Sequence, residues 1–517
     1  MGGGTAVIPA PVLNFSALAP IGFVAAGAML VLLGEVLLSR RKTVLGRRAT
    51  DTWIGSLLAM VSIASLMLAF YVAWVAFIGG RSEVFDPGNP TFQLDRFSAL
   101  ITALIALAAL LSCALAISYL AEVRINHGEY YALLLLATAG MMLMVSAVDF
   151  LTVFLGLELM SIPIYVLAGF DRRRLRSNES ALKYFLIGSF ASALLLYGMA
   201  LLYGTTGSTS FAVIRHGFDP ANPIALVGLG LVIVGFAFKI SAAPFHQWTP
   251  DVYEGAPSAV TAFMSVTVKI AAVATLLRLV ALAFGPLDQT LTQVLWGLAA
   301  LTIVVGNVMA VIQDNIKRLL AYSSIAHAGY LLVGFVTGTA EGYSAVVFYL
   351  LAYVFMNLGA FAVVVALAQR GQDCERIESF AGLAQSRPGL AALMTLFMLS
   401  LAGIPGTVGF IAKFTIFAAA VNAGVIWLTL LGLLASVVSV YYYLRLPVLM
   451  YMREPSEDAA APREVSSGEA LVLGFCALAV VLLGFFPNGS NLLFFGDIQV
   501  LDWARESVTQ LFSSGLS

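Results

Sequence analysis

Apolar runs of about twenty residues recur along almost the whole chain, and each is long enough to cross a bilayer as a helix. The 517 residues are 60% hydrophobic and only 11% charged, whereas a soluble domain carries about 25% charged residues. Helices are favoured over open sheets because a helix satisfies its backbone hydrogen bonds internally within lipid. We therefore expect an all-α polytopic membrane protein, with residues 1–517 forming a single membrane domain.

Fourteen membrane-spanning helices are predicted. The N-terminus lacks the basic stretch of a signal peptide, so the first apolar run is expected to remain as a span. The tail beyond Phe486 mixes apolar and charged residues and is expected to form an interfacial helix. The predicted spans are 17–38, 53–78, 97–120, 130–147, 148–170, 180–203, 223–253, 257–284, 291–312, 318–338, 342–369, 390–421, 424–450 and 467–487.

Basic residues concentrate in alternate loops, which predicts the orientation of the chain. Because basic loops stay in the cytoplasm, the loops after odd-numbered spans are expected to be cytoplasmic. Both termini would then face outward, away from the cytoplasm. The odd loops include Arg40–Lys42, Arg172–Arg176 and Lys317–Arg318, whereas the even loops carry only Arg81, Arg96 and Arg215.

Two of the predicted spans are interrupted by glycine and proline. The seventh breaks at Pro244, and the twelfth breaks at Gly403–Gly406. Proline removes a backbone donor and clashes with the preceding turn, and paired interruptions are typical of inverted repeats with a site near each break. We expect discontinuous helices 7 and 12 within two inverted five-helix repeats. The predicted parts are helices 1–3 in 1–128, the repeats in 130–284 and 291–450, and the last helix and tail in 467–517.

An acidic residue and a lysine stand out in the fifth and sixth spans. Glu158 lies in mid-span, where a carboxylate is costly unless it is protonated or paired. The alternative role is a protonated hydrogen bond between helices. Lys183 lies about one turn inside its span, and its alternative is to snorkel to the interface. If the two side chains pair, opening the pair would release a proton from the lysine.

Three further lysines lie deep in apolar helices or beyond a break. Lys239 and Lys269 are near the middle of spans seven and eight, where burial disfavours the charged form. Lys413 follows the second break and is the expected terminal proton donor. Its alternative is a counter-charge for a helix end. These lysines predict a hydrated ion or proton path beside the broken helices.

Two histidines complete the candidate site. His327 lies at mid-depth, and its ordinary pKa near 6.5 suits a proton relay. The alternative is a histidine satisfied by a neighbouring hydroxyl. His246 is a tentative member that either lines the seventh-span break or caps it. Asp251 and Glu254 are expected at the cytoplasmic end, as an inlet vestibule, a docking surface or plainly solvated acids.

Other residue patterns exclude several function classes. The net charge of −1 gives no reason to expect a nucleic-acid partner, and the three cysteines and four histidines are scattered. No metal site is therefore expected, and neither a P-loop nor a Rossmann glycine pattern is present. Sodium would need several oxygen ligands, so a row of lysines with one deep acid favours protons. Arg278 and Arg445 are expected to snorkel or to contact partners.

Five segments of the chain resemble a known family. They resemble the antiporter-like membrane subunits of bacterial NADH-quinone oxidoreductase, respiratory complex I, and among these the N type. Subunits L and M carry His-Thr-Trp-Leu-Pro-Asp where this chain has His246-Gln-Trp-Thr-Pro-Asp251. The segments are FKISAAPFHQWTPDVYEGAP, LGLELMSIPIYVLAGF, NESALKYFLIGSFASA, IKRLLAYSSIAHAGYLLVG and LAGIPGTVGFIAKF.

The resemblance implies a proton-translocating subunit without redox chemistry of its own. NADH, FMN, iron–sulfur clusters and quinone would be bound by partner subunits, and the partners would be other membrane-arm subunits and the lipid bilayer. An Mrp-type monovalent cation/proton antiporter subunit is the alternative, and a purely scaffolding subunit is a third. The proton-path residues that the resemblance implies are Glu158, Lys183, Lys239, Lys269, His327 and Lys413.

Overall fold

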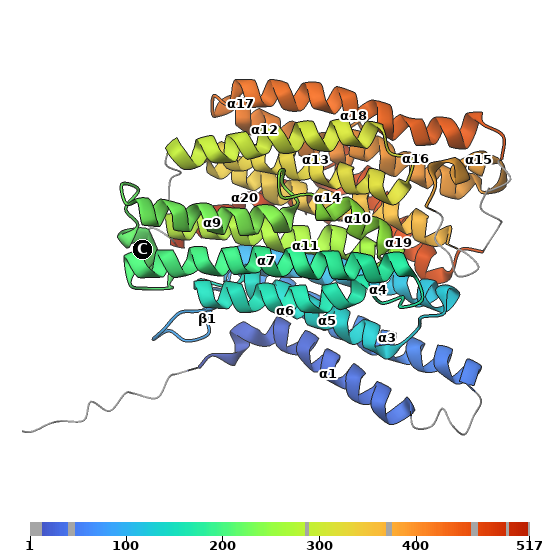
Figure 1. Ribbon diagram of the computed structural model, residues 1–517, viewed down its shortest axis with the longest axis horizontal. Helices are drawn as coiled ribbons and strands as arrows, with labels where there is room; N and C mark the ends of the chain where they lie inside the picture. Colours follow the sequence, from blue (N-terminus) through green and yellow to red (C-terminus); the bar gives the residue numbers. More distant parts are fainter. Residues whose placement is uncertain are drawn as a thin grey trace, which may run out of the picture.

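The computed structural model describes residues 13–39, 47–284, 289–368, 375–455, 464–492 and 496–514. Long helices run roughly alongside one another along the length of the molecule (Figure 1). The helices up to the middle of the chain are α1 (Ala19–Ser39), α3 (Arg47–Ile78), α4 (Arg96–Val123), α5 (Gly128–Val145), α6 (Phe150–Ala168), α7 (Leu175–Thr206), α8 (Phe211–Gly217), α9 (Pro223–Ile240), α10 (Trp248–Gly255) and α11 (Ser258–Leu279).

The remaining elements include further long helices and two short hairpins. A π-helical turn, η2 (Val280–Phe284), extends α11, and short 3-10 helices are η1 (Phe15–Leu18) and η3 (Ile377–Phe380). The antiparallel pairs are β1 (Glu83–Val84) with β2 (Gln93–Leu94), and β3 (Asn488–Leu492) with β4 (Gly496–Gln499). The later helices are α12 (Gln289–Val311), α13 (Ile316–Val336), α14 (Ala340–Ala366), α15 (Leu383–Ser386), α16 (Pro388–Ala402), α17 (Val408–Asn422), α18 (Ile426–Met452), α19 (Ser467–Phe485) and α20 (Val500–Ser514).

The number of spans agrees with the prediction from hydropathy. Over the described ranges, thirteen helices are long and apolar enough to cross a membrane. The predicted twelfth span is present as two shorter apolar helices, α16 and α17. The tail helix α20 packs on the bundle, where the Phe512 and Tyr343 rings stack with centroids 5.5 Å apart. Arg40–Lys42 and both chain ends lie outside the described residues.

Both predicted breaks begin at a left-handed residue. Ser241 ends α9 with φ of 65°, and Gly403 ends α16 with φ of 84°. A left-handed C-cap turns the chain out of the helix and lets the cap amide bond the last carbonyls. The prolines that follow, Pro244 and Pro405, cannot continue the helix. Helices 7 and 12 are therefore discontinuous, as predicted.

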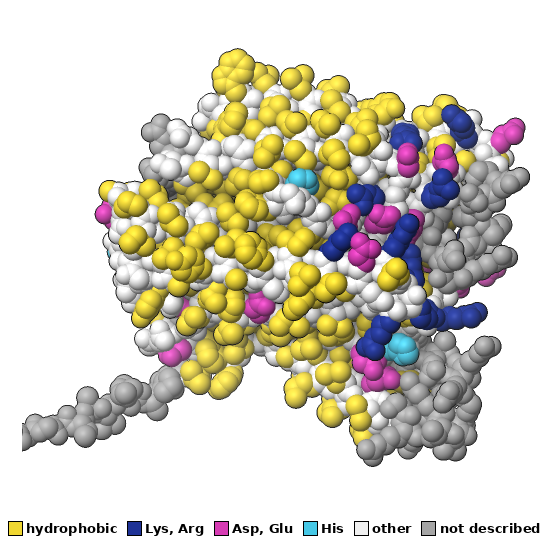
Figure 2. Space-filling view, in the orientation of Figure 1, with side chains coloured by type: hydrophobic (Ala, Val, Ile, Leu, Met, Phe, Trp, Pro, Cys, Tyr) yellow, Lys and Arg dark blue, Asp and Glu magenta, His cyan; other side chains and the backbone are white. Residues whose placement is uncertain are grey.

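The two broken segments run in opposite directions. Figure 1 shows α9 to the left of α10, but α16 to the right of α17. Inverted repeats require this reversal. Basic and acidic side chains gather toward the right-hand end of the molecule, and apolar side chains cover the middle (Figure 2).

Three helices form the centre of the bundle. The apolar stretch of α13 is wholly buried, and those of α11 and α14 are 94% buried. The outward-facing surface is supplied by helices such as α1, α7, α12 and α18. At most 39% of the apolar stretch of each of these helices is buried. Side chains on α11 and α13 are therefore shielded on all sides by protein rather than by lipid.

Candidate functional site

Lys239 lies at the end of α9 and is hydrogen-bonded to α6. Its Nζ donates to Ser161 Oγ at 2.7 Å and to Tyr165 Oη at 3.3 Å. The ammonium also lies 5.4 Å from the centre of the Tyr165 ring. Only 3% of Lys239 is exposed, so hydroxyl and ring contacts replace bulk water around its charge.

Glu158 lies one turn before Ser161 on the same helix. It is half-buried, next to the outward-facing Leu155 and Ile162. The carboxylate interacts electrostatically with Lys239. Its Oε1 is buried and has no hydrogen-bond partner among the residues that the structure describes. The fold thus brings Glu158 and Lys239 together at the edge of the bundle, with one acid oxygen left to accept a proton or a new partner.

Lys183 makes different ion pairs from the hypothetical one with Glu158. Its Nζ lies 2.7 Å from Glu179 Oε1 and 3.0 Å from Asp251 Oδ2. Its side chain is 41% exposed, because it lies near the N-terminal end of α7 and reaches toward the charged end of the molecule. This position agrees with the snorkelling alternative. Lys183 pairs with Glu179 and Asp251 rather than with Glu158.

The two acids of α10 are ion-paired and not merely solvated. Asp251 bridges Lys183 and Arg318, whose Nη1 lies 2.8 Å from Asp251 Oδ1. Glu254 bonds Arg318 at 2.9 Å and Arg176 at 3.3 Å. Cations of α7 and α13 therefore hold both acids of α10 in place.

Lys269 connects α11 to α13. Its Nζ donates to the Ser324 hydroxyl at 2.6 Å and also to the Ser324 carbonyl. The ammonium lies 5.4 Å from the centre of the Tyr353 ring, and Lys269 is 2% exposed. Like Lys239, it is therefore a buried ammonium held by a serine on the neighbouring helix.

His327 has a hydroxyl on each side of its ring. Nδ1 bonds Tyr349 Oη, and Nε2 lies 3.2 Å from Tyr443 Oη. The same Tyr443 hydroxyl also bonds Ser323 Oγ. The charges of Lys413 and Lys269 both act on His327. The alternative of a hydroxyl-satisfied histidine and the relay interpretation are therefore compatible, because the hydroxyls are themselves proton carriers.

Lys413 bonds across the second break. Its Nζ donates to the carbonyl of Ala402 at 2.8 Å, at the C-terminal end of α16, where a positive charge is favourable. The Tyr330 ring centre lies 5.1 Å away. Lys413 also lines a mostly apolar cavity of about 460 Å³, with Phe410 and Phe414 among its other walls. The ammonium is therefore a helix-end counter-charge beside a cavity.

His246 lines the first break. The N-cap of α10 is Gln247, so the imidazole does not occupy the capping position. Its Nδ1 is buried without a hydrogen-bond partner in the described part of the chain. The side chain is not among the groups that contact Lys239 above.

Arg278 is expected to snorkel or to contact partners, but the structure buries it completely. Its Nη1 lies 2.8 Å from Asp95 Oδ2, and its Nε donates to the Ala147 carbonyl at 3.0 Å. A guanidinium that cannot reach water needs a fixed anion, and Asp95 is the N-cap of α4. Arg445 instead pairs with the exposed Asp314 at 2.7 Å.

The residues that hold these charges were largely missed. Ser161 and Tyr165 follow Glu158 by three and seven positions on α6, a spacing that puts all three on one helix face. That spacing could have identified them. Tyr349 and Tyr443 come from α14 and α18, far from His327 in sequence, and no local pattern points to them.

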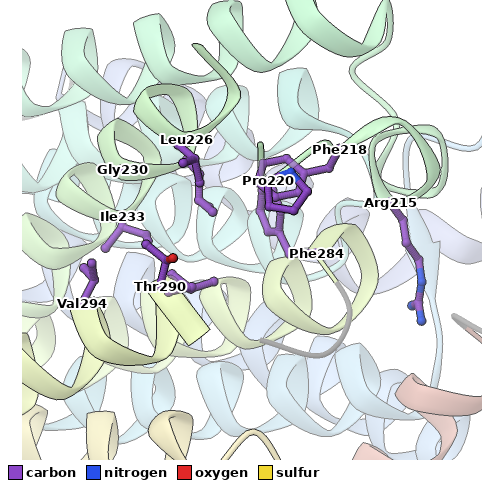
Figure 3. A pocket seen from close by; sticks show the side chains of 11 residues that line it. Arg215, Phe218, Pro220, Leu226, Gly230, Ile233, Phe284, Thr290 and Val294 are labelled. Atoms are coloured by element: carbon purple, nitrogen blue, oxygen red, sulfur yellow. The ribbon is translucent and has the colours of Figure 1, made fainter. Parts of the chain in front are cut away.

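A second cavity lies apart from all of these residues. It has a volume of about 260 Å³ and is lined mainly by apolar side chains of α9, η2 and α12, with Arg215 beside it (Figure 3). It contains none of the predicted site residues. Over the described ranges, no group of three or more His, Cys, Asp or Glu is placed to hold a metal ion.

Residues 147–439 match the family described as "NADH:quinone oxidoreductase/Mrp antiporter, TM". The chain is 48% identical to NADH-quinone oxidoreductase subunit N of Trichlorobacter lovleyi over 432 residues, which are 81% of this chain and 88% of that protein. It is 43% identical to subunit N 1 of Sorangium cellulosum, covering 92% of this chain and 97% of the relative. The chain belongs to the NADH-quinone oxidoreductase subunit N family.

Solved structures of this family and of its relatives share the fold. A chain of respiratory complex I from Thermus thermophilus with bound aureothin is 36% identical with a TM-score of 0.73, over 89% of this chain and 97% of that one. A chain of the Mrp complex from Dietzia is 22% identical with a TM-score of 0.80, over 97% and 98%. The Mrp similarity establishes the fold alone, whereas the subunit N relatives establish the family.

Proposed function

We propose that this chain is the proton-translocating N subunit of the membrane arm of an NADH-quinone oxidoreductase. The observation that carries the proposal is the set of buried cationic side chains held by hydroxyl groups. Lys239 is held by Ser161, Lys269 by Ser324, and His327 by Tyr349 and Tyr443. Buried ammonium groups with exchangeable hydroxyl partners are suited to holding and passing protons.

Energy from quinone reduction would reach the chain as a change of charge near Glu158. The acid lies at the edge of the bundle and interacts with Lys239. A new positive charge outside the bundle would offset the negative charge of the Glu158 carboxylate. The Lys239 ammonium would then be stabilised less and would release its proton more readily. The proton would pass toward Lys269, His327 and Lys413, from which it would leave on the periplasmic side.

The redox chemistry belongs to partner subunits in this proposal. NADH, FMN, iron–sulfur clusters and quinone would be bound there, and neighbouring antiporter-like and small helical subunits would contact this chain in the bilayer. We place the protein in the bacterial inner membrane with both termini in the periplasm. We further propose that 130–284 and 291–450 are the repeat units, flanked by 1–128 and 467–517.

The test is the Lys239→Ala variant of the assembled complex, reconstituted in proteoliposomes. We expect NADH-driven proton uptake to fall at least several-fold in a complex with normal subunit content. Lys42→Ala, in a predicted cytoplasmic loop, is the control and is expected to pump normally. Unchanged pumping by Lys239→Ala would favour a scaffolding role. A chain that purifies without flavin and iron–sulfur subunits and exchanges sodium for protons would favour an Mrp-type antiporter.

A further inference from the structure

A polar vestibule lies between α7 and α10 at the charged end of the molecule. Its volume is about 240 Å³, and it is open on one side. The cavity contains both the Lys183–Asp251 ion pair and the second acid of α10. Its lining residues are Arg176, Glu179, Ser180, Lys183, Asp251, Glu254 and Gly255.

A stacked pair of aromatic rings joins the same two helices that form this vestibule. The Tyr184 and Trp248 rings are parallel within 5°, with centroids 4.3 Å apart. Tyr184 follows Lys183 on α7, and Trp248 lies one turn before Asp251 on α10. The same two helices are therefore joined twice, by an ion pair in the vestibule and by stacked rings.

The other side of the ring pair faces Lys239. The Lys239 ammonium lies 5.8 Å from the centre of the Tyr184 ring. The Trp248 indole donates its N–H to the carbonyl of Phe238 at 3.1 Å, one residue before the lysine. Tyr184 and Trp248 are 1% and 4% exposed. The buried rings therefore contact the surroundings of Lys239, and their sequence neighbours Lys183 and Asp251 line the vestibule.

Ion pairs set the position of α10. Asp251 is held from α7 by Lys183 and from α13 by Arg318, while Glu254 is held by Arg176 and Arg318. Glu179 is the remaining charged group that contacts Lys183. If Asp251 became neutral, Lys183 and Arg318 would each lose one ionic partner, and α10 would be held less firmly. Trp248 would move with α10, because both residues belong to the same short helix.

We propose that the Tyr184–Trp248 stack is a gate between the vestibule and Lys239, and that the Asp251 ion pairs keep it closed. Protons from the cytoplasmic side would collect in the vestibule and reach Lys239 only when α10 shifts and the rings separate. The inference rests on the proposed function, because it names the inlet of the same proton path. It assigns a gating role to two aromatic residues and a latching role to Asp251.

Cysteine accessibility tests the gate without measuring pumping. The reporter is Ser161→Cys, next to Lys239, in a chain whose three native cysteines are replaced by alanine. A small cationic thiol reagent is added to inside-out membrane vesicles that contain the assembled complex. Trp248→Ala is expected to speed labelling by about tenfold, the scale expected when one aromatic pair no longer opposes opening. Trp248→Phe keeps a stackable ring and is expected to stay close to the parent rate.

Two further variants complete the design. Asp251→Asn is expected to speed labelling, because a neutral amide cannot replace the ion pairs. A separate Ser400→Cys reporter, buried in α16, is expected to label at the same rate with or without Trp248→Ala. Equal Ser161→Cys labelling in all variants would overturn the gate, as would equally fast labelling in Trp248→Phe or a parallel rise at Ser400→Cys. If the proposed function were wrong, Lys239→Ala would pump normally. The differences in Ser161→Cys labelling between the gate variants would persist in that case.

Discussion

Lys239 and Ser161 are joined by a 2.7 Å hydrogen bond between α9 and α6. The bond joins the broken helix to α6. The same helix carries Glu158, one turn before Ser161. It explains how a fully buried ammonium is tolerated beside a break in the helix. The serine supplies the polar partner that lipid and apolar side chains cannot.

Removing the Ser161 hydroxyl should impair proton transfer without loss of assembly. A hydrogen bond to a charged group contributes about 1.5–3 kcal/mol, so Ser161→Ala is expected to lower NADH-driven proton uptake several-fold. The measurement is pumping by reconstituted complex at matched subunit content. Ser112→Ala is the control, since the Ser112 hydroxyl donates to the Ala108 carbonyl of its own helix at 2.7 Å. Equal pumping by the two variants would contradict the role of Ser161.

The Tyr443 hydroxyl should matter more than that of its neighbour. Tyr443→Phe removes the group that bonds both Ser323 and His327, so proton uptake is expected to fall. Where proton transfer limits the rate, loss of one relay group lowers the rate by about 10²-fold or more. Tyr442→Phe is the control, because Tyr442 donates to Asn307 at 3.1 Å and also bonds Tyr443, but has no contact with the imidazole in the described part of the chain. A larger defect in Tyr442→Phe would argue against a relay through Tyr443.

Breaking the Arg278–Asp95 pair should destabilise the chain strongly. Arg278→Met leaves a buried carboxylate without its cation, which costs about 3–5 kcal/mol. The expected result is a lower yield of assembled complex and a lower unfolding temperature in detergent. The double variant Arg278→Met/Asp95→Asn should recover part of the loss. Arg445→Met removes a largely exposed pair, and its expected cost is about 0–1 kcal/mol. A similar cost for Arg278→Met and Arg445→Met would refute the argument.

A side chain at Gly403 should disturb Lys413 as well as the backbone. Its φ is 84°, and an added Cβ would lie 2.9 Å from Lys413 Cδ. Gly403→Ala therefore combines backbone strain of about 1–2 kcal/mol with displacement of the lysine. Gly424→Ala has similar strain at φ of 78° but open space around its Cβ. We expect both variants to lose stability and only Gly403→Ala to lose proton uptake. A pumping defect of the same size in both would assign the effect to strain alone.

The sequence alone was enough for the spans, the two breaks and the burial of Lys239, Lys269 and Lys413. Hydropathy and the charge of the loops are local properties of the chain, and proline and glycine act on the residues next to them. This is why α9 ends at Ile240 and α16 at Ala402, a few residues before Pro244 and Pro405. Lys239, Lys269 and His327 are likewise buried as their positions in apolar helices indicated.

Only the tertiary structure decided what each charge contacts. Lys183 reaches Asp251 and not Glu158 because the packing of α7 against α10 brings the two side chains within 3.0 Å. Arg278 is buried because the fold places Asp95, at the start of α4, within ion-pairing distance of it. Partners such as Tyr443 lie more than a hundred residues from His327, and packing between helices, which no local pattern encodes, brings them within hydrogen-bonding distance. The broken helix around Lys239 is thus a local feature, but the rings and hydroxyls that enclose its charge are a consequence of the fold.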